Sequence, residues 1–131
     1  MIHRKTLTEG DARYAMSNGD FPQSVAASRD FVAVILTQSW CPDWTWMRDW
    51  LDRQGSGGQA DPEEMEIDVY ELEYNRVDYF EEFRHFKERT FANDLIPYVR
   101  YYVRGRFVGD SNQVSAKAFY SRFRGQCSDG A

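Results

Sequence analysis

The feature that most constrains the fold is an apolar run that leads into a cysteine and a proline. Residues Phe31–Leu36 are all apolar, and the sequence Trp-Cys-Pro-Asp-Trp follows at positions 40–44. A short apolar run is typical of a strand that is buried on both faces, as central parallel strands are. Proline is favoured at the first position of a helix. We therefore predict a buried strand over 31–37, a helix over about 42–53, and Cys41 at their junction.

The position of Cys41 predicts a nucleophilic thiol. The first backbone N–H groups of a helix and its macrodipole favour the thiolate, the form of cysteine that attacks disulfides. The neighbouring carboxylate of Asp43 opposes the thiolate through like charge. The only other cysteine is Cys127, and two cysteines do not make a disulfide framework.

The remaining patterns predict a mixed sheet with helices on both faces. We expect a helix from Thr8 to Ser17, with Asp11 placed as in a capping box, and a short helix after Pro22. We then expect a strand over 65–74, a helix over 77–89, a hairpin over 98–110 and a last helix that contains Phe119. The order αβαβαββα indicates a sheet with parallel and antiparallel pairs. We predict one domain over 1–131, with N-terminal helices over 1–30, a core over 31–124 and a mobile tail over 125–131.

Composition excludes several classes of function. Aromatic residues make up 16% of the 131 residues and the net charge is −5, which argues against disorder and against a nucleic-acid surface. No apolar run approaches the roughly 20 residues of a membrane span, and no apolar segment follows the basic N-terminus, so we expect a cytoplasmic protein. His3 and His85 lie far apart without zinc-ligand spacing, so we expect no metal and no cofactor.

The Trp-Cys-Pro-Asp-Trp sequence and the late Ile96-Pro97-Tyr98 together resemble the thioredoxin superfamily, whose signature is Trp-Cys-x-x-Cys with a facing cis-proline. The resemblance covers about 31–123 and implies a three-layer αβα sandwich. It implies that Cys41 is an exposed nucleophile, that Pro97 is cis and that the backbone of Ile96 pairs with a bound peptide. The substrate-binding residues that it implies are Trp40, Pro42, Asp43, Trp44, Ile96 and Pro97.

Three departures from the family pattern bear on the chemistry. Trp44 replaces the second, resolving cysteine of the motif. Ile35 stands where the family has a buried acid, and Glu71 stands where a lysine is often found. We expect Cys127 at the opposite edge of the sheet, beyond the roughly 7 Å between Cα atoms that a disulfide requires. The resemblance therefore implies a protein that lacks intramolecular release of a mixed disulfide.

The resulting prediction is a thioredoxin-like protein with a single active-site cysteine. It would carry out thiol–disulfide exchange with, or capture, a protein, peptide or small-thiol partner such as glutathione. The alternative is a redox-inactive module that binds a protein or peptide, with Trp44 as the expected surface contact. A glutathione-dependent protein that resembles glutaredoxin is a third option, although the sequence shows no clear glutathione-binding pattern.

Several charged residues are expected on solvated faces, where alternation or helical spacing explains them without a binding role. These residues are Glu63, Glu64, Glu66, Asp68, His85, the helix charges at 81–82 and 87–89, Arg100, Arg104 and Arg106.

Overall fold

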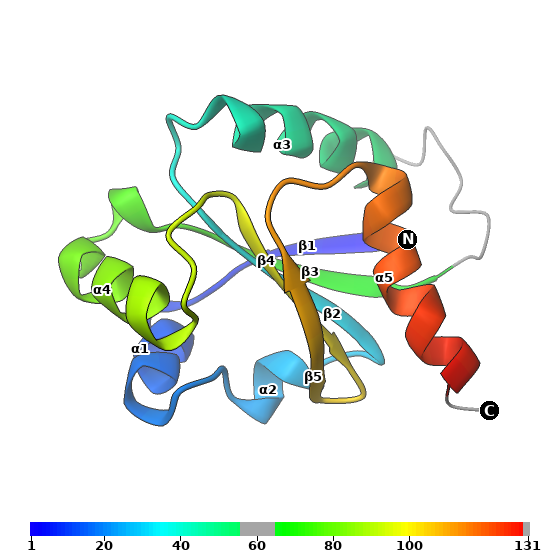
Figure 1. The fold of residues 1–131 in the computed structure, drawn as a ribbon, viewed down its shortest axis with the longest axis horizontal. Helices are drawn as coiled ribbons and strands as arrows, with labels where there is room; N and C mark the ends of the chain where they lie inside the picture. Colours follow the sequence, from blue (N-terminus) through cyan, green and yellow to red (C-terminus); the bar gives the residue numbers. More distant parts are fainter. Residues whose placement is uncertain (56–64, 130–131) are drawn as a thin grey trace.

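The computed structural model describes residues 1–55 and 65–129, with side chains described over 1–54 and 65–124. It consists of one five-stranded sheet with helices on both faces (Figure 1). The elements in chain order are β1 (Ile2–Thr6), α1 (Glu9–Asn18), α2 (Gln23–Ala26), β2 (Phe31–Thr37), α3 (Pro42–Gly55), β3 (Ile67–Glu73), the 3-10 turn η1 (Tyr74–Arg76), α4 (Phe80–Thr90), β4 (Tyr98–Val103), β5 (Arg106–Ser111) and α5 (Ala116–Asp129).

The sheet has the strand order β1-β3-β2-β4-β5, and it is mixed, as predicted. The strands β1, β3 and β2 are parallel, whereas β4 is antiparallel to both β2 and β5. Within the register, Ile35 of β2 lies opposite Glu71 of β3 on one side and Val99 of β4 on the other. The three parallel strands therefore finish at the same end of the sheet, and Cys41 follows β2 at that end.

Alternating side chains of β2 form two cores, one on each face. Ala33 and Ile35 belong to the core under α3 and α5, and Val34 and Leu36 belong to the core under α1, α2 and α4. Figure 1 shows α3 along the top of the view, α1 and α2 along the bottom, and α4 at the left. Since every side chain from Val32 to Leu36 is fully buried, the continuous apolar run is explained by burial on both faces.

Helix α1 begins and ends as the sequence predicts. The Thr8 hydroxyl accepts a hydrogen bond from the N–H of Asp11 at 3.1 Å, and so it caps the start of the helix. Gly19 ends the helix in the left-handed conformation with φ 87°. No helix in the described part of the chain is long and apolar enough to cross a membrane.

The two ends of the chain differ from the prediction. Residues 2–6 form β1, an edge strand that the sequence analysis did not predict, and Ile2 pairs with Ile67 of β3. Helix α5 continues to Asp129, so 125–129, which were expected in the tail, are helical. Pairing with β3, rather than a periodic pattern, accounts for β1, because only Ile2 of its five residues is buried.

Three charged residues that were expected on solvated faces are buried, so those predictions were wrong. Asp68 is 1% exposed, Lys87 is 0% exposed and Arg100 is 7% exposed. Each of the three has polar partners. Asp68 accepts hydrogen bonds from Ser28, Arg29 and Lys5. Lys87 donates to backbone carbonyls, and Arg100 donates to Asp20 and to the hydroxyls of Tyr98 and Tyr102. His85, Glu66, Arg104 and Arg106 are not buried, and Glu63 and Glu64 lie outside the described residues.

Candidate active site

Cys41 lies directly before α3, at the end of the sheet where the parallel strands finish. Its carbonyl accepts a hydrogen bond from the N–H of Thr45 at 3.1 Å, so the first turn of the helix begins at the cysteine. Its side chain is 5% exposed, and Sγ lies 3.8 Å from the carbonyl oxygen of Ile96, to which the thiol donates. The structure thus places Cys41 as predicted relative to α3, but in a buried rather than an exposed position. The side chain of Cys127 lies outside the described residues.

The segment that faces Cys41 precedes β4. The Ile96–Pro97 peptide bond is cis, as the resemblance implies. Ile96 is partly buried and Pro97 is buried, whereas Leu95 is 60% exposed. The structure therefore brings Cys41 and Ile96 together, although the two are 55 residues apart in sequence.

The loop before Cys41 is held by the 3-10 turn that follows β3. Asn75 of η1 accepts from the N–H of Ser39 and donates to the Ser39 hydroxyl, both at 2.8 Å. Trp40 is 66% exposed, and its indole N–H donates to Gln38 at 2.7 Å. Asn75 was not identified from the sequence, because its role depends on the pairing of β2 with β3. The result is a fixed loop that presents Trp40 to solvent beside a buried thiol.

Trp44 occupies the third position after Cys41 and is almost completely buried, at 1% exposure. The prediction that it is the main surface contact was therefore wrong. Its indole N–H donates to Glu73 Oε2 at 2.8 Å, and it belongs to the same core as Met47 and Leu51, which follow at helical spacing. The exposed indoles are instead those of Trp40 and, at 49%, Trp46.

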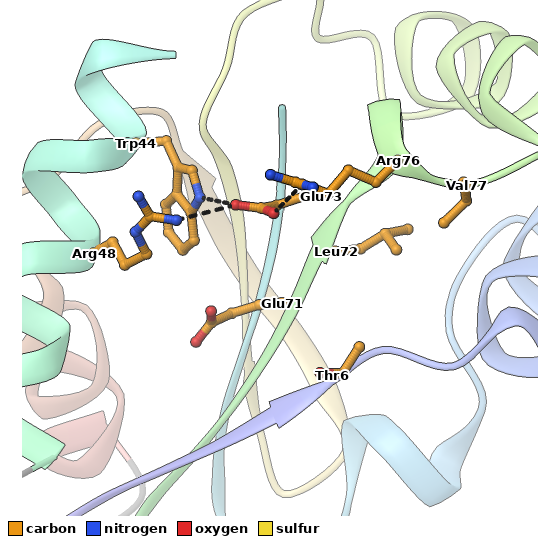
Figure 2. A pocket seen from close by; sticks show the side chains of 8 residues that line it. All are labelled: Thr6, Trp44, Arg48, Glu71, Leu72, Glu73, Arg76 and Val77. Carbon is orange, nitrogen blue, oxygen red and sulfur yellow. Dashed lines mark hydrogen bonds and ion pairs between the residues drawn. The ribbon is translucent and has the colours of Figure 1, made fainter. Parts of the chain in front are cut away.

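Glu73 is the polar centre of an open cavity of about 370 Å³ next to Trp44, shown in Figure 2. Its carboxylate accepts from Trp44, from Arg48 at 3.4 Å and from Arg76 at 3.0 Å. The residues that line the cavity are Thr6, Trp44, Arg48, Glu71, Leu72, Glu73, Arg76 and Val77. Cys41 is not among them.

Ile35 and Glu71 lie opposite each other in the sheet beneath α3. Ile35 is fully buried, so no carboxyl group stands at its position. Glu71 accepts two hydrogen bonds from Arg4 of β1, at 2.5 and 2.8 Å, and hydrogen bonding to Glu71 is the main cause that raises the pKa of Arg4. Glu71 is therefore paired with Arg4, and Ile35 carries no titratable group. Among the residues whose side chains are described, Cys41 is the one cysteine at this site.

Comparison with solved structures shows the fold. The chain superimposes on oxidised thioredoxin O1 from Arabidopsis thaliana with a TM-score of 0.56 and 10% identity, over 92% of each chain. It superimposes on a point-mutant thioredoxin from Halobacterium salinarum with a TM-score of 0.55 and 11% identity, over 92% of this chain and 85% of the other. For a mutated buckwheat glutaredoxin the TM-score is 0.50 and the identity 14%, over 88% of each chain.

Scans of the sequence against family models and curated proteins found no match. The structural similarities are at low identity and establish the architecture alone. The chain has a thioredoxin-like α/β fold with one described cysteine at the end of the sheet where the parallel strands finish. In the described part of the chain, no group of three His, Cys, Asp or Glu side chains could hold a metal ion.

Proposed function

We propose that this protein acts through Cys41 as a single-thiol protein that exchanges with, or captures, the disulfide of a protein, peptide or small-thiol partner. The observation that carries the proposal is the position of Cys41 directly before α3, where its carbonyl accepts the first helical hydrogen bond from the N–H of Thr45. The N-terminus of a helix of this length stabilises a thiolate through its free N–H groups and its dipole.

The reaction is a thiol–disulfide exchange. The Cys41 thiolate attacks one sulfur of a partner disulfide, a new bond forms between Cys41 and that sulfur, and the other partner sulfur leaves as a thiolate. The two electrons of the attacking sulfur form the new bond, and those of the broken S–S bond leave with the departing thiolate. Cys41 is then oxidised as a mixed disulfide, and half of the partner is reduced.

Release from the mixed disulfide requires a second thiol. Trp44 stands where the related motif has its resolving cysteine, and its buried indole fills that space. We therefore propose that an external thiol, such as glutathione, attacks the mixed disulfide and returns Cys41 to the reduced state. Without such a thiol the protein holds its partner covalently.

The proposed contact surface surrounds the thiol. Trp40, Pro42 and Asp43 are exposed on the helix side, and Leu95 is exposed on the facing segment. Ile96 follows Leu95 and carries the carbonyl that accepts from Cys41 Sγ. Because Cys41 is only 5% exposed, a partner reaches the sulfur only where these residues admit it.

The test is formation of a mixed disulfide by the folded protein. In a Cys127→Ser background, the reduced protein is mixed with glutathione disulfide and analysed by intact mass spectrometry. The proposal predicts one glutathione adduct on Cys41, loss of the adduct on addition of a second thiol, and no adduct in the Cys41→Ser variant. A folded protein that forms no adduct, while the urea-unfolded protein does, would contradict it.

A second candidate function is a redox-inactive module that binds a protein or peptide. The observation in its favour is the exposure of Trp40 at 66%, Trp46 at 49% and Leu95 at 60%, since exposed aromatic side chains are enriched at binding hot spots. The two functions separate by mutation once a partner is isolated. Binding that survives Cys41→Ser and is lost with Trp40→Ala would favour the module, and Trp44→Ala is unsuitable because Trp44 is buried.

A further inference from the structure

Lys87 is the most deeply buried charged side chain near the candidate site. It lies on α4, and its side chain is 0% exposed. Its ammonium donates to the carbonyl oxygens of Asn93 and Leu95, both at 2.8 Å, and Nζ lies 5.4 Å from the centre of the Tyr98 ring. Both of these hydrogen-bond acceptors of Lys87 are main-chain carbonyls of the segment that leads to Pro97.

That segment carries the group that meets Cys41. Figure 1 shows the connection between α4 and β4 rising to the end of the sheet at which α3 begins. Lys87 binds the carbonyl of Leu95, and the next carbonyl along the chain, that of Ile96, accepts from Cys41 Sγ. One peptide unit therefore separates the bound ammonium from the oxygen that contacts the thiol.

The segment is also held from the side of β5. Asn112 and Asn93 donate to each other's side-chain oxygens at 3.0 and 3.2 Å, and Asn112 donates to the carbonyl of Pro97 at 3.1 Å. The N–H of Leu95 donates to the side chain of Asn93 at 3.0 Å. Asn112 thus holds the segment through the Asn93 side chain and the Pro97 carbonyl, whereas Lys87 binds the carbonyls of Asn93 and Leu95.

We propose that Lys87 is a positioning residue for the Cys41 site, because its side chain fixes the 93–96 backbone so that the Ile96 carbonyl faces the thiol. The inference rests on the function proposed for Cys41. Without the amine, the Asn93 and Leu95 carbonyls lose their donor, and a buried carbonyl without a donor is costly, so these groups turn to water. The segment then opens more often, and Cys41 loses the cover that keeps it 5% exposed.

The experiment compares three variants in a Cys127→Ser background. Lys87→Met keeps the length and bulk of the side chain and removes its donors. Lys87→Arg keeps donors and charge. Lys117→Met removes a lysine of α5 that is not buried and serves as the matched control. For each variant, native-state amide hydrogen exchange is measured along the chain, together with the rate at which iodoacetamide alkylates Cys41.

The proposal predicts a local effect at two places. In Lys87→Met, exchange of the Leu95 amide, whose N–H donates to Asn93, and alkylation of Cys41 both rise at least about tenfold over Lys117→Met, as expected for loss of hydrogen bonds from a charged donor. Exchange of the central strand β2 changes much less, and Lys87→Arg stays close to wild type. If Lys87→Met does not fold, Lys87→Gln replaces it, because its shorter amide cannot reach both carbonyls and the same local rise is required.

Other outcomes overturn the proposal. They are unchanged exchange of the Leu95 amide, a rise that is equal across the whole sheet, or a folded Lys87→Arg variant that behaves as Lys87→Met does. Hydrogen exchange does not depend on thiol chemistry. A wild-type protein that forms no mixed disulfide while the exchange result holds would therefore reject the proposed function and leave the role of Lys87 in place.

Discussion

The indole N–H of Trp44 donates to Glu73 Oε2 at 2.8 Å, from within the core under α3. Residue 44 is the position at which the motif that the sequence resembles has its second cysteine. Here the position holds a large side chain that is 1% exposed and is part of the hydrophobic core. Cys41 remains as the one described thiol at this end of the sheet.

Replacement of Trp44 by alanine is expected to destabilise the fold strongly. The change creates a cavity and removes one of the donors to Glu73, and we expect a loss of about 3–5 kcal/mol in the free energy of unfolding. Urea unfolding followed by circular dichroism measures it. The control is Trp46→Ala on the same helix, where the indole is 49% exposed and the expected loss is within about 1 kcal/mol. Equal losses for the two variants would show that Trp44 is not a core residue.

Asp68 is expected to stabilise the fold through its charge. Burial acts to raise the pKa of this carboxyl, but hydrogen bonds from Ser28, Arg29 and Lys5 outweigh burial and lower it. We expect Asp68→Asn to cost about 1.5–3 kcal/mol at neutral pH, as for hydrogen bonds to a charged group. Glu66→Gln, two residues earlier and exposed, is the control and should leave the unfolding midpoint nearly unchanged.

The contribution of the Asp68 charge should depend on pH with a definite sign. Because the pKa is lower in the folded than in the unfolded protein, the contribution is present above about pH 4 and is lost as the pH falls through the folded value. The difference in unfolding free energy between wild type and Asp68→Asn should therefore shrink on acidification. A difference that stays constant from pH 7 to pH 3 would contradict this account.

Lys87 should give a slope of the same sign, on the alkaline side. Burial lowers the pKa of its amine from 10.5 to about 8, so the folded protein releases this proton before the unfolded chain does. Burial of the charged amine lowers the free energy of unfolding below pH 8. This loss is recovered as the pH rises toward 10.5, by up to about 1.4 kcal/mol per pH unit. The neutral amine still has two N–H donors for its two carbonyls.

The measurement is the unfolding free energy of wild type minus that of Lys87→Met, from pH 7 to pH 9.5. Taking the difference cancels the titration of groups that both proteins share, such as Tyr101, whose pKa burial raises to about 12. The predicted difference rises with pH above 8. A flat or falling difference would show that burial does not lower the pKa of the Lys87 amine.

Much of the fold could be predicted because its central elements have strong local patterns. The run from Phe31 to Leu36 is apolar at every position, and Pro42 starts α3 where proline is favoured. The edge strand β1 has no such pattern: it pairs on one side only, with β3, and its residues are mostly polar. Its formation depends on a partner more than 60 residues away, which local periodicity does not reveal.

The candidate site was predicted in part for a similar reason. Cys41 and Ile96 were identified from motifs, and the structure brings them together. Trp44 was misplaced because it lies at the margin of the apolar arc of α3, where spacing alone does not decide between core and surface. Lys87 lies four residues after the buried Phe83, so helical spacing places it on the buried face of α4. It was predicted to be solvated because it is charged.

The account is tested most directly by the rate at which Cys41 reacts with a disulfide reagent in the folded protein at pH 7. The measurement uses the Cys127→Ser variant and follows the coloured thiolate released from an aromatic disulfide, with and without urea. The account predicts that the folded protein forms one mixed disulfide per molecule, at a rate within about one order of magnitude of the unfolded chain because Cys41 is partly covered. A folded protein that reacts orders of magnitude more slowly than the unfolded chain would contradict it, because Cys41 would then be a buried structural residue.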